Sequence, residues 1–205
     1  MTTRTIIGLY DTYEDAAHTV RDLEAANLRD ADISFISHRT EDHIVTDDSS
    51  GAAAGAEAGA AAGAALGGGA GLLAGLGMLA IPGVGPVVAA GWLVVTAAGA
   101  LAGAAAGGAT GGLIGSMMSA GVSREHASFY AEGVRRGGSL VTARVDESHF
   151  ETAEAIMQRH GRIDPVTREK AYRDTGWKTF DEKAIPYSSA DLARERARYP
   201  IRPLI

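Results

Sequence analysis

The apolar positions of the first fifty residues change their spacing twice along the chain. The run from Arg4 to Tyr10 is rich in β-branched residues and predicts a strand. From Tyr13 to Leu23, apolar residues recur every three or four positions, which is the spacing of one buried helix face. Alternation returns between Ala31 and Ser37, as in a second strand. Residues 1–50 therefore predict a β-α-β unit, the first half of a small domain.

A similar pattern occupies residues 122–166. Ser123 is the predicted cap of a helix, and a pair of glycines marks the end of that helix. Leu140–Val145 then predicts a third strand. A second amphipathic helix follows, and then Arg162–Val166 predicts a short fourth strand, at a sheet edge because it contains a proline. With residues 51–121 set aside, the order β-α-β, helix, β-α-β is that of a ferredoxin-like sheet with one extra helix. The predicted fold class is α+β.

Residues 51–121 form a long insertion of glycine and alanine, and no charged side chain occurs between Ala58 and Ser123. The glycines fall into two runs in which neighbours stand four residues, or a multiple of four, apart. The runs are Gly51, Gly55, Gly59, Gly63, Gly67, Gly71 and Gly75, then Gly91, Gly99, Gly103, Gly107, Gly111 and Gly115. In a helix, residues four apart share a face, so each run predicts a glycine-zipper groove along which another backbone packs closely.

The two glycine runs are joined by the segment Ile81-Pro82-Gly83-Val84-Gly85-Pro86. Pro82, Gly83, Gly85 and Pro86 break a continuous helix and reverse the chain, which predicts an antiparallel helical hairpin. Each interior glycine costs a solvated helix about 1 kcal/mol relative to alanine. The hairpin therefore needs a closely packed partner, either its own second arm, other subunits or lipid. Homo-oligomerisation through the glycine faces is the main functional prediction.

Residues with a strong membrane preference cluster at the predicted hairpin tip, between Leu66 and Leu101. An arm of about 30 residues is about 45 Å long as a helix, which exceeds the bilayer core of about 30 Å. We therefore predict a protein associated with the inner membrane, with membrane lipid as a partner. A water-soluble assembly whose hairpins bury one another is the alternative.

Residues 167–205 form a polar tail whose charge is opposite to that of the N-terminal segment. The tail carries 9 basic and 6 acidic side chains, whereas residues 1–50 carry 4 basic and 11 acidic ones. The two ends attract each other within one chain or between subunits, although a solvated tail has the same composition. The aromatic residues Trp177, Phe180 and Tyr187 predict positions at which the tail docks.

Composition and motifs argue against several classes of protein. The net charge of -6 and the pI near 5.5 argue against a nucleic-acid partner. Cysteine is absent, so no disulfide or thiolate site exists, and the N-terminus shows no secretory signal, which predicts a cytoplasmic location. No phosphate loop, catalytic triad or carboxylate pair occurs. We therefore predict a non-enzymatic protein without a cofactor, a metal or a small-molecule substrate.

Three segments, together with the glycine runs, resemble a known family. They are Thr5-Ile6-Ile7-Gly8-Leu9-Tyr10-Asp11, Ala80-Ile81-Pro82-Gly83-Val84-Gly85-Pro86 and Tyr130-Ala131-Glu132-Gly133-Val134-Arg135-Arg136-Gly137-Gly138. Over residues 4–165 the chain resembles bacterial general stress proteins of the low-temperature-induced or YflT-like heat-induced family. The resemblance implies a context of stress and supplies no catalytic residues.

Three hypotheses follow. The first is a non-enzymatic stress protein that self-associates through its glycine-zipper hairpin and associates with the cytoplasmic membrane. The second is a soluble homo-oligomeric scaffold or shell whose hairpins lie in a shared core. The third, a ligand-binding or sensory ferredoxin-like module, rests on analogy of fold alone.

Overall fold

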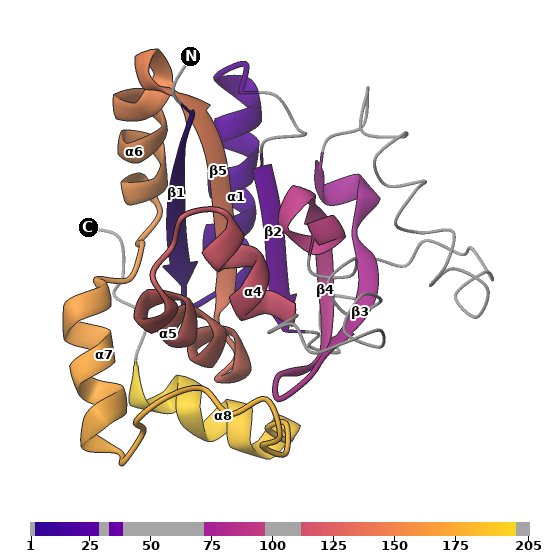
Figure 1. Cartoon of the computed structure of the whole chain (residues 1–205), viewed down its shortest axis with the longest axis vertical. Coiled ribbons are helices and arrows are strands. Elements are labelled where there is room, and N and C mark those ends of the chain that lie inside the picture. The colour runs from indigo at the N-terminus through magenta and orange to yellow at the C-terminus, as the bar shows by residue number, and fades with distance from the viewer. Residues whose placement is uncertain (1–2, 29–32, 39–71, 97–111, 200–205) are drawn as a thin grey trace.

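A computed structural model of the chain describes residues 3–28, 33–38, 72–96 and 112–199. These residues form a mixed α+β fold around a five-stranded sheet in which all neighbouring strands are antiparallel (Figure 1). The strand order is β1 (Thr3–Tyr10), β5 (Ser139–Asp146), β2 (Ile33–His38), β4 (Gly85–Gly91) and β3 (Gly77–Ile81).

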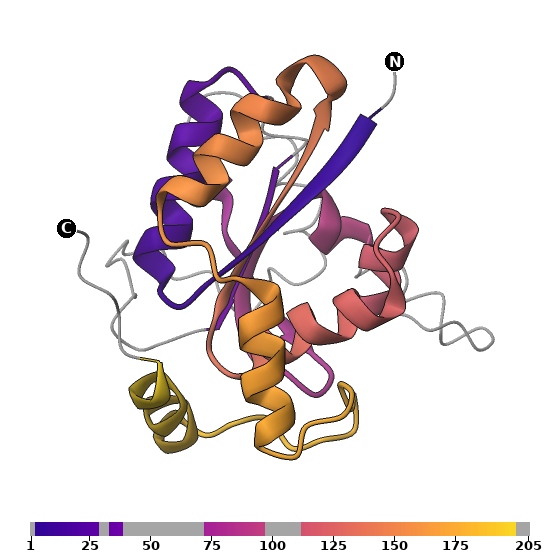
Figure 2. The same ribbon diagram turned by 90° about the vertical axis from the view of Figure 1, so that its left-hand side faces the viewer.

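Helices cover both faces of this sheet. They are α1 (Tyr13–Ala25), α4 (Gly112–Ser119), α5 (Arg124–Arg135), α6 (Phe150–Arg159), α7 (Pro165–Asp174) and α8 (Ser189–Arg198), with short 3-10 helices η3 (Leu72–Gly75) and η4 (Glu147–His149). The pair α1 and α6 lies on one face, and the pair α4 and α5 lies on the other (Figure 2). Helices α7 and α8 lie at one end of the sheet, with α7 to the left of α5 and α8 below it in Figure 1.

Alternation along β1 divides the core into two apolar clusters. Ile6 and Tyr10 point toward α1 and α6, and the Tyr10 hydroxyl donates to the main-chain carbonyl of Met157 at 2.8 Å. Ile7 and Leu9 point to the opposite face, where α4 and α5 pack. Strands β2 and β5 are therefore buried on both faces within a three-layer sandwich, whereas most of the edge strand β3 is exposed.

The predicted local elements on either side of the insertion are confirmed for three strands and for the helices between them. The cap at Ser123 is confirmed as well, because its hydroxyl accepts a hydrogen bond from the main-chain N–H of His126 at 3.3 Å. Gly137, with a φ of +94°, follows the end of α5, where an L side chain is disfavoured. Strand β5 lies between β1 and β2, so the first β-α-β unit is split by the third predicted strand.

The prediction of a fourth strand at Arg162–Val166 is wrong. Residues 161–164 form no regular element, and Pro165 begins α7. Asp164 caps this helix by accepting the main-chain N–H of Thr167 at 2.7 Å, and proline fits the first turn because no helical hydrogen bond needs its missing N–H. Ile163 donates one main-chain hydrogen bond to Leu9 at 2.8 Å, and this bond joins the segment to the edge of β1.

The helical prediction is also wrong for residues 77–91, which form the β3–β4 hairpin at the other edge of the sheet. The chain reverses at the predicted turn, but between strands, because Gly83 and Gly85 take φ values of +75° and +102°. Gly91 allows β4 to approach the neighbouring strand closely, because a Cβ there would lie 2.1 Å from the carbonyl oxygen of Ile33. This part of the predicted insertion therefore belongs to the domain itself. Among the described helices, none is both long and apolar enough to cross a bilayer.

A candidate functional site at the C-terminal arm

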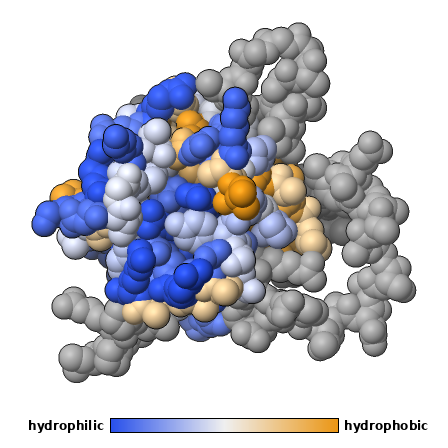
Figure 3. All heavy atoms as spheres, turned by 90° about the horizontal axis from the view of Figure 1, so that it is seen from below, coloured by the Kyte–Doolittle hydropathy of each residue, from blue (hydrophilic) through white to orange (hydrophobic). Residues whose placement is uncertain are grey.

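Residues 165–199, called the C-terminal arm below, run along α5 and return to its C-terminal end. α7 begins the arm, an irregular connection follows, and α8 completes it. Figure 3 views the molecule from below in the orientation of Figure 1, where α7 and α8 lie, and that face is mostly hydrophilic. Within the predicted polar tail, residues 167–199 are packed against the body.

The motif Tyr130–Gly138 forms the end of α5 and part of the surface on which the arm packs. Its glycines allow close approach: a Cβ on Gly133 would lie 2.3 Å from Cδ2 of Leu9, and one on Gly138 would lie 2.9 Å from the carbonyl oxygen of Gly133. A larger residue at either position would push α5 away from β1. Gly133 and Gly138 thus allow the end of the helix to lie close to the sheet.

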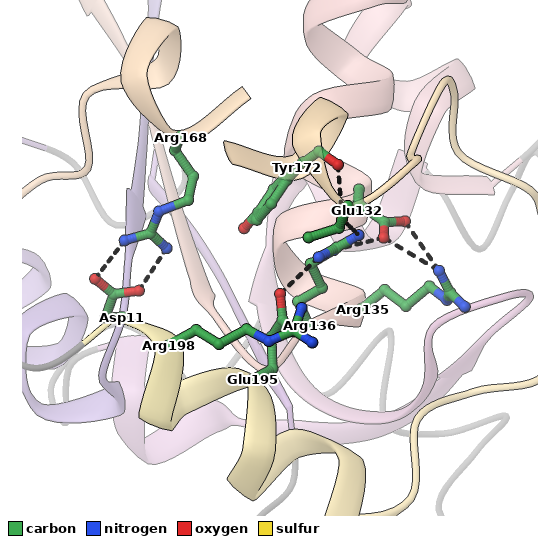
Figure 4. Close-up of polar contacts among 9 residues, drawn as sticks. Asp11, Glu132, Arg135, Arg136, Arg168, Tyr172, Glu195 and Arg198 are labelled. Atoms are coloured by element: carbon green, nitrogen blue, oxygen red, sulfur yellow. Dashed lines mark hydrogen bonds and ion pairs between the residues drawn. The ribbon is translucent and has the colours of Figure 1, made fainter. Parts of the chain in front are cut away.

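Arg136 is the centre of a buried charge network between α5 and α8 (Figure 4). Its Nε donates to Oε1 of Glu132 at 2.7 Å, and its Nη1 donates to Oε1 of Glu195 at 2.6 Å. The guanidinium lies 4.3 Å from the ring centroid of Tyr172 in α7. One arginine therefore connects α5, α7 and α8.

Two further arginines pair with the same two carboxylates. Nη1 of Arg135 lies 3.1 and 3.2 Å from the two oxygens of Glu132, although Glu132 itself is fully buried. Nη1 of Arg198 lies 3.2 Å from Oε2 of Glu195. Buried charges are tolerated when they are paired and hydrogen-bonded, and both carboxylates here meet that condition.

A second ion pair holds α7 to the end of β1. Arg168 binds Asp11 through two hydrogen bonds, of 2.7 and 2.8 Å, and its guanidinium lies 3.8 Å from the ring centroid of Tyr199. Parallel double hydrogen bonds of this kind are strong and fix the geometry of both partners. The arm is thus fastened at α7 as well as at α8.

The electrostatics of these groups follow from burial and pairing. Burial alone would lower the pKa of Arg136, but its hydrogen bonds to Glu132 and Glu195 outweigh that effect and raise the pKa above its ordinary value. Burial likewise opposes the charge of Arg168, and the hydrogen bonds to Asp11 raise its pKa overall. The pKa of Tyr172 is raised chiefly by burial. Both arginines therefore stay charged and Tyr172 stays neutral throughout the physiological range.

A small hollow lies in the middle of this network, with Gly133, Gly137 and Gly138 on one side and Arg136, Arg168 and Tyr172 around it. Its volume is about 10 Å³, on the order of one water molecule. No group of three His, Asp or Glu side chains within the described ranges is arranged to hold a metal ion. The charged side chains around the hollow pair with one another, so the network suits docking of the arm.

The turn motif meets the same arm at its irregular connection. A Cβ on Gly83 would lie 2.6 Å from the carbonyl oxygen of Asp181, and one on Gly85 would lie 2.9 Å from Cβ of Pro186. Pro82 and Pro86 flank this contact and are exposed. Two of the motifs on which the family resemblance rests, the turn and the end of α5, therefore both pack against the C-terminal arm.

The three aromatic residues predicted to dock the tail all contact the body. Phe180 is buried, and its main-chain N–H donates to the Ser128 hydroxyl at 2.7 Å. Trp177 packs at the edge of the core cluster on the α5 side. The Tyr187 ring lies 4.6 Å from the guanidinium carbon of Arg135.

The predicted helix-packing glycines are only partly within the described residues. Gly75 lies in η3, Gly91 in β4 and Gly115 in α4. Those outside the described residues are Gly51, Gly55, Gly59, Gly63, Gly67, Gly71, Gly99, Gly103, Gly107 and Gly111. The structure does not bring the three described glycines together in one helical face.

Sequence reasoning missed the charged residues of the network. Glu132, Arg135 and Arg136 stand three and four residues apart on α5, a spacing that predicts ion pairs on a helix. That signal was present, but nothing local pointed to Glu195 as the distant partner. Comparison with known proteins adds no relative: no family model, no curated protein and no solved structure matches the chain.

Proposed function

We propose that this protein is a non-enzymatic stress-response protein that self-associates through the glycine faces of residues 51–71 and 97–111. The observation that carries the proposal is the spacing of four between glycines in both segments, without a charged residue from Ala58 onward. Such faces gain stability only from close packing against another backbone. The stress context is supported by the motif resemblance.

The attachment points of the two segments support the same proposal. The first segment leads into η3 and β3, and the second follows β4. Gly77, at the start of β3, pairs with Ala89, close to the end of β4 at Gly91. The described strands that flank the two segments are therefore held beside one another, which supports packing of one segment on the other in the proposal.

The charged residues of the C-terminal arm support a packing role for this part of the body. The charged side chains of the arm network are used in pairing one another, and the hollow between them is on the order of one water in volume. Strand β5 lies between β1 and β2, and this split β-α-β arrangement is the one expected of a ferredoxin-like fold. A ferredoxin-like domain therefore stays part of the proposal. The hollow in the arm network is too small to support a ligand-binding role at this place.

Replacing Gly63, Gly67, Gly103 and Gly107 with leucine tests the proposal, because it fills the glycine faces. We expect the native mass in detergent-free buffer to fall to that of the monomer. The matched control places four leucines at Ala61, Ala65, Ala105 and Ala109, on the opposite face of the proposed helices, and should keep the wild-type mass. Equal masses for the two variants would exclude self-association through the glycine faces.

A second observation bears on whether the assembly forms in the membrane or in water. Leu72, Val87 and Leu93, which belong to the apolar cluster predicted as the membrane-inserted tip, are buried in the protein core. This burial favours a soluble homo-oligomeric scaffold over a membrane-associated protein. Membrane fractionation separates the two: the scaffold predicts recovery in the supernatant, and membrane association predicts recovery only with detergent.

A further inference from the structure

The irregular connection between α7 and α8 packs on the turn of the β3–β4 hairpin. Residues 180–187 of this connection are called the strap below. An ideal Cβ on Gly83 would lie 2.6 Å from a main-chain carbonyl oxygen of the strap, and one on Gly85 would lie 2.9 Å from Cβ of Pro186. Val84, between the two glycines, is fully buried. The strap therefore contacts the main chain of the turn directly.

The strap is fastened to the body near its two ends. At one end Phe180 is buried, and its main-chain N–H donates to the Ser128 hydroxyl at 2.7 Å. At the other end the Tyr187 ring lies 4.6 Å from the guanidinium carbon of Arg135. Between these ends, the side chain of Ile185 is 86 % exposed. A segment with few buried contacts of its own opens at a low cost in free energy, so the strap stays closed only while both ends are held.

A continuous series of contacts joins the second end of the strap to α8. Tyr187 packs on Arg135, whose Nη1 donates to the two oxygens of Glu132 at 3.1 and 3.2 Å. Arg136 donates to the same carboxylate at 2.7 Å and to Glu195 of α8 at 2.6 Å. Figure 4 shows the ionic part of this series, in which both arginines bind Glu132. Loss of the Glu195 contact therefore acts on the charge network against which Tyr187 packs.

The main chain makes a second connection between the strap and α8. Tyr187 is followed directly by Ser188, the N-cap of α8, whose hydroxyl accepts the main-chain N–H of Asp191 at 3.2 Å. Asp191 in return accepts the main-chain N–H of Ser188 at 3.0 Å. This capping box fixes the way in which the chain enters the helix. Tyr187 and α8 therefore move together.

We propose that α8 is the latch that holds the strap closed: when Glu195 leaves Arg136, the strap opens and the turn of the β3–β4 hairpin loses this contact. The two states are distinct because a buried ion network is either complete or leaves a costly unpaired charge. On its other side the turn keeps the contact between Nε2 of His38 and the Val84 carbonyl oxygen, at 3.2 Å. Opening therefore loosens the hairpin without removing it from the sheet.

The latch deepens the proposed function, on which its biological meaning rests. The first glycine segment leads into η3 and β3, and the second follows β4, so both are attached to this hairpin. In the proposal, a closed strap holds the hairpin in one orientation for self-association, and an open strap releases that constraint. The C-terminal arm thus regulates the assembly from a site that contains no residue of either glycine segment.

Hydrogen exchange in the full-length chain tests the latch. The Val84 N–H, which bonds to the Ile81 carbonyl oxygen at 3.0 Å, reports on the turn. The Leu192 N–H, which bonds to the Ser188 carbonyl oxygen at 2.9 Å, reports on α8. In Glu195→Ala we expect both amides to exchange at least about tenfold faster than in the wild type, while the amides of β1 and β5 keep their rates.

The matched control is Arg194→Ala, which removes an exposed charge from the same helix and should leave both rates unchanged. Faster exchange at Leu192 alone in Glu195→Ala would overturn the latch, because α8 would then undock while the strap stays closed. Unchanged rates at both amides, or an equal acceleration in β1 and β5, would overturn it as well. The rates are read at any oligomeric mass, so the latch and the proposed self-association can fail independently.

Tyr187→Ala interrupts the same route at the strap and should by itself accelerate exchange at Val84. If the latch acts through Tyr187, the double variant with Glu195→Ala should exchange at Val84 no faster than the more affected single variant. Accelerations that multiply in the double variant would show two independent effects and would contradict the route.

Discussion

The two sides of the sheet are stabilised in different ways. On the α1–α6 side, Val20, Leu23 and Met157 are fully buried among other apolar side chains. On the side of the C-terminal arm, an apolar cluster is also present, but α8 is joined to it through Arg136 and its two buried carboxylates, Glu132 and Glu195.

The difference matters because the two kinds of contact respond differently to a single change. Apolar packing loses stability in proportion to the side-chain volume removed. A buried ion network behaves otherwise: it adds little net stability when complete, yet removal of one member leaves an uncompensated charge. The arm is therefore the side on which a single charged residue matters most.

The largest effect is expected from Arg136→Met. The substitution leaves Glu132 and Glu195 without their shared partner and should lower the free energy of unfolding by about 3–5 kcal/mol, measured by urea denaturation. The double variant Glu132→Leu with Arg136→Met removes the stranded charge on α5 and should recover part of this loss. A double variant less stable than the single one would show that the network acts mainly through net attraction.

A comparable truncation on the apolar side should have a smaller effect. Leu23→Ala deletes a fully buried side chain from α1 and should cost about 3 kcal/mol, within the range for leucine-to-alanine changes in cores. Because α1 does not touch the arm network, the rate of trypsin cleavage in α8 should stay at the wild-type value. Faster cleavage in α8 would mean that the two sides are coupled.

Alkaline pH should weaken the apolar side through Tyr10. Burial raises the pKa of its hydroxyl to about 12, above the ordinary value near 10. The folded state holds this proton more tightly, so its stabilisation is complete below pH 10 and is lost as the pH rises toward 12, by about 2–3 kcal/mol at most. Urea unfolding at a series of pH values should show this loss in the wild type and a smaller one in Tyr10→Phe. Equal slopes would rule out Tyr10 as the cause.

The smallest effect is expected at the partly exposed ion pair between α1 and α6. The hydrogen bond from His160 lowers the pKa of Asp22, and Arg159 adds to this effect. Asp22→Asn should cost less than about 1 kcal/mol at pH 7 because the pair is open to solvent. A lowered carboxyl pKa gives stability above the unfolded value of 3.8 that is lost as the pH falls below it. Denaturation of both proteins at pH 3 should therefore show a smaller difference, and an undiminished one would contradict the assignment.

Local elements were predictable because their signals lie within a few residues. Ser123 at the start of α5 and the glycines after its end mark a helix by capping chemistry alone. Pro165 was misleading because proline suits both a sheet edge and the first turn of a helix, and only the cap at Asp164 decides for the helix.

The β3–β4 hairpin and the arm network were not predictable in the same way. Gly91 fits the spacing of a glycine zipper, yet its role depends on a contact with Ile33, far away in the sequence. The pairing of Arg136 with Glu195 likewise joins residues that only the folded chain brings together. Periodicity reports which residues share a face within one element, and it carries no information about the element on the other side.

Self-association is the central claim, and the native mass of the wild-type protein tests it most directly. Light scattering in detergent-free buffer should give an oligomer whose mass is a multiple of 21.1 kDa and does not change when mild detergent is added. A single species at 21.1 kDa, at all concentrations and with or without detergent, would contradict it.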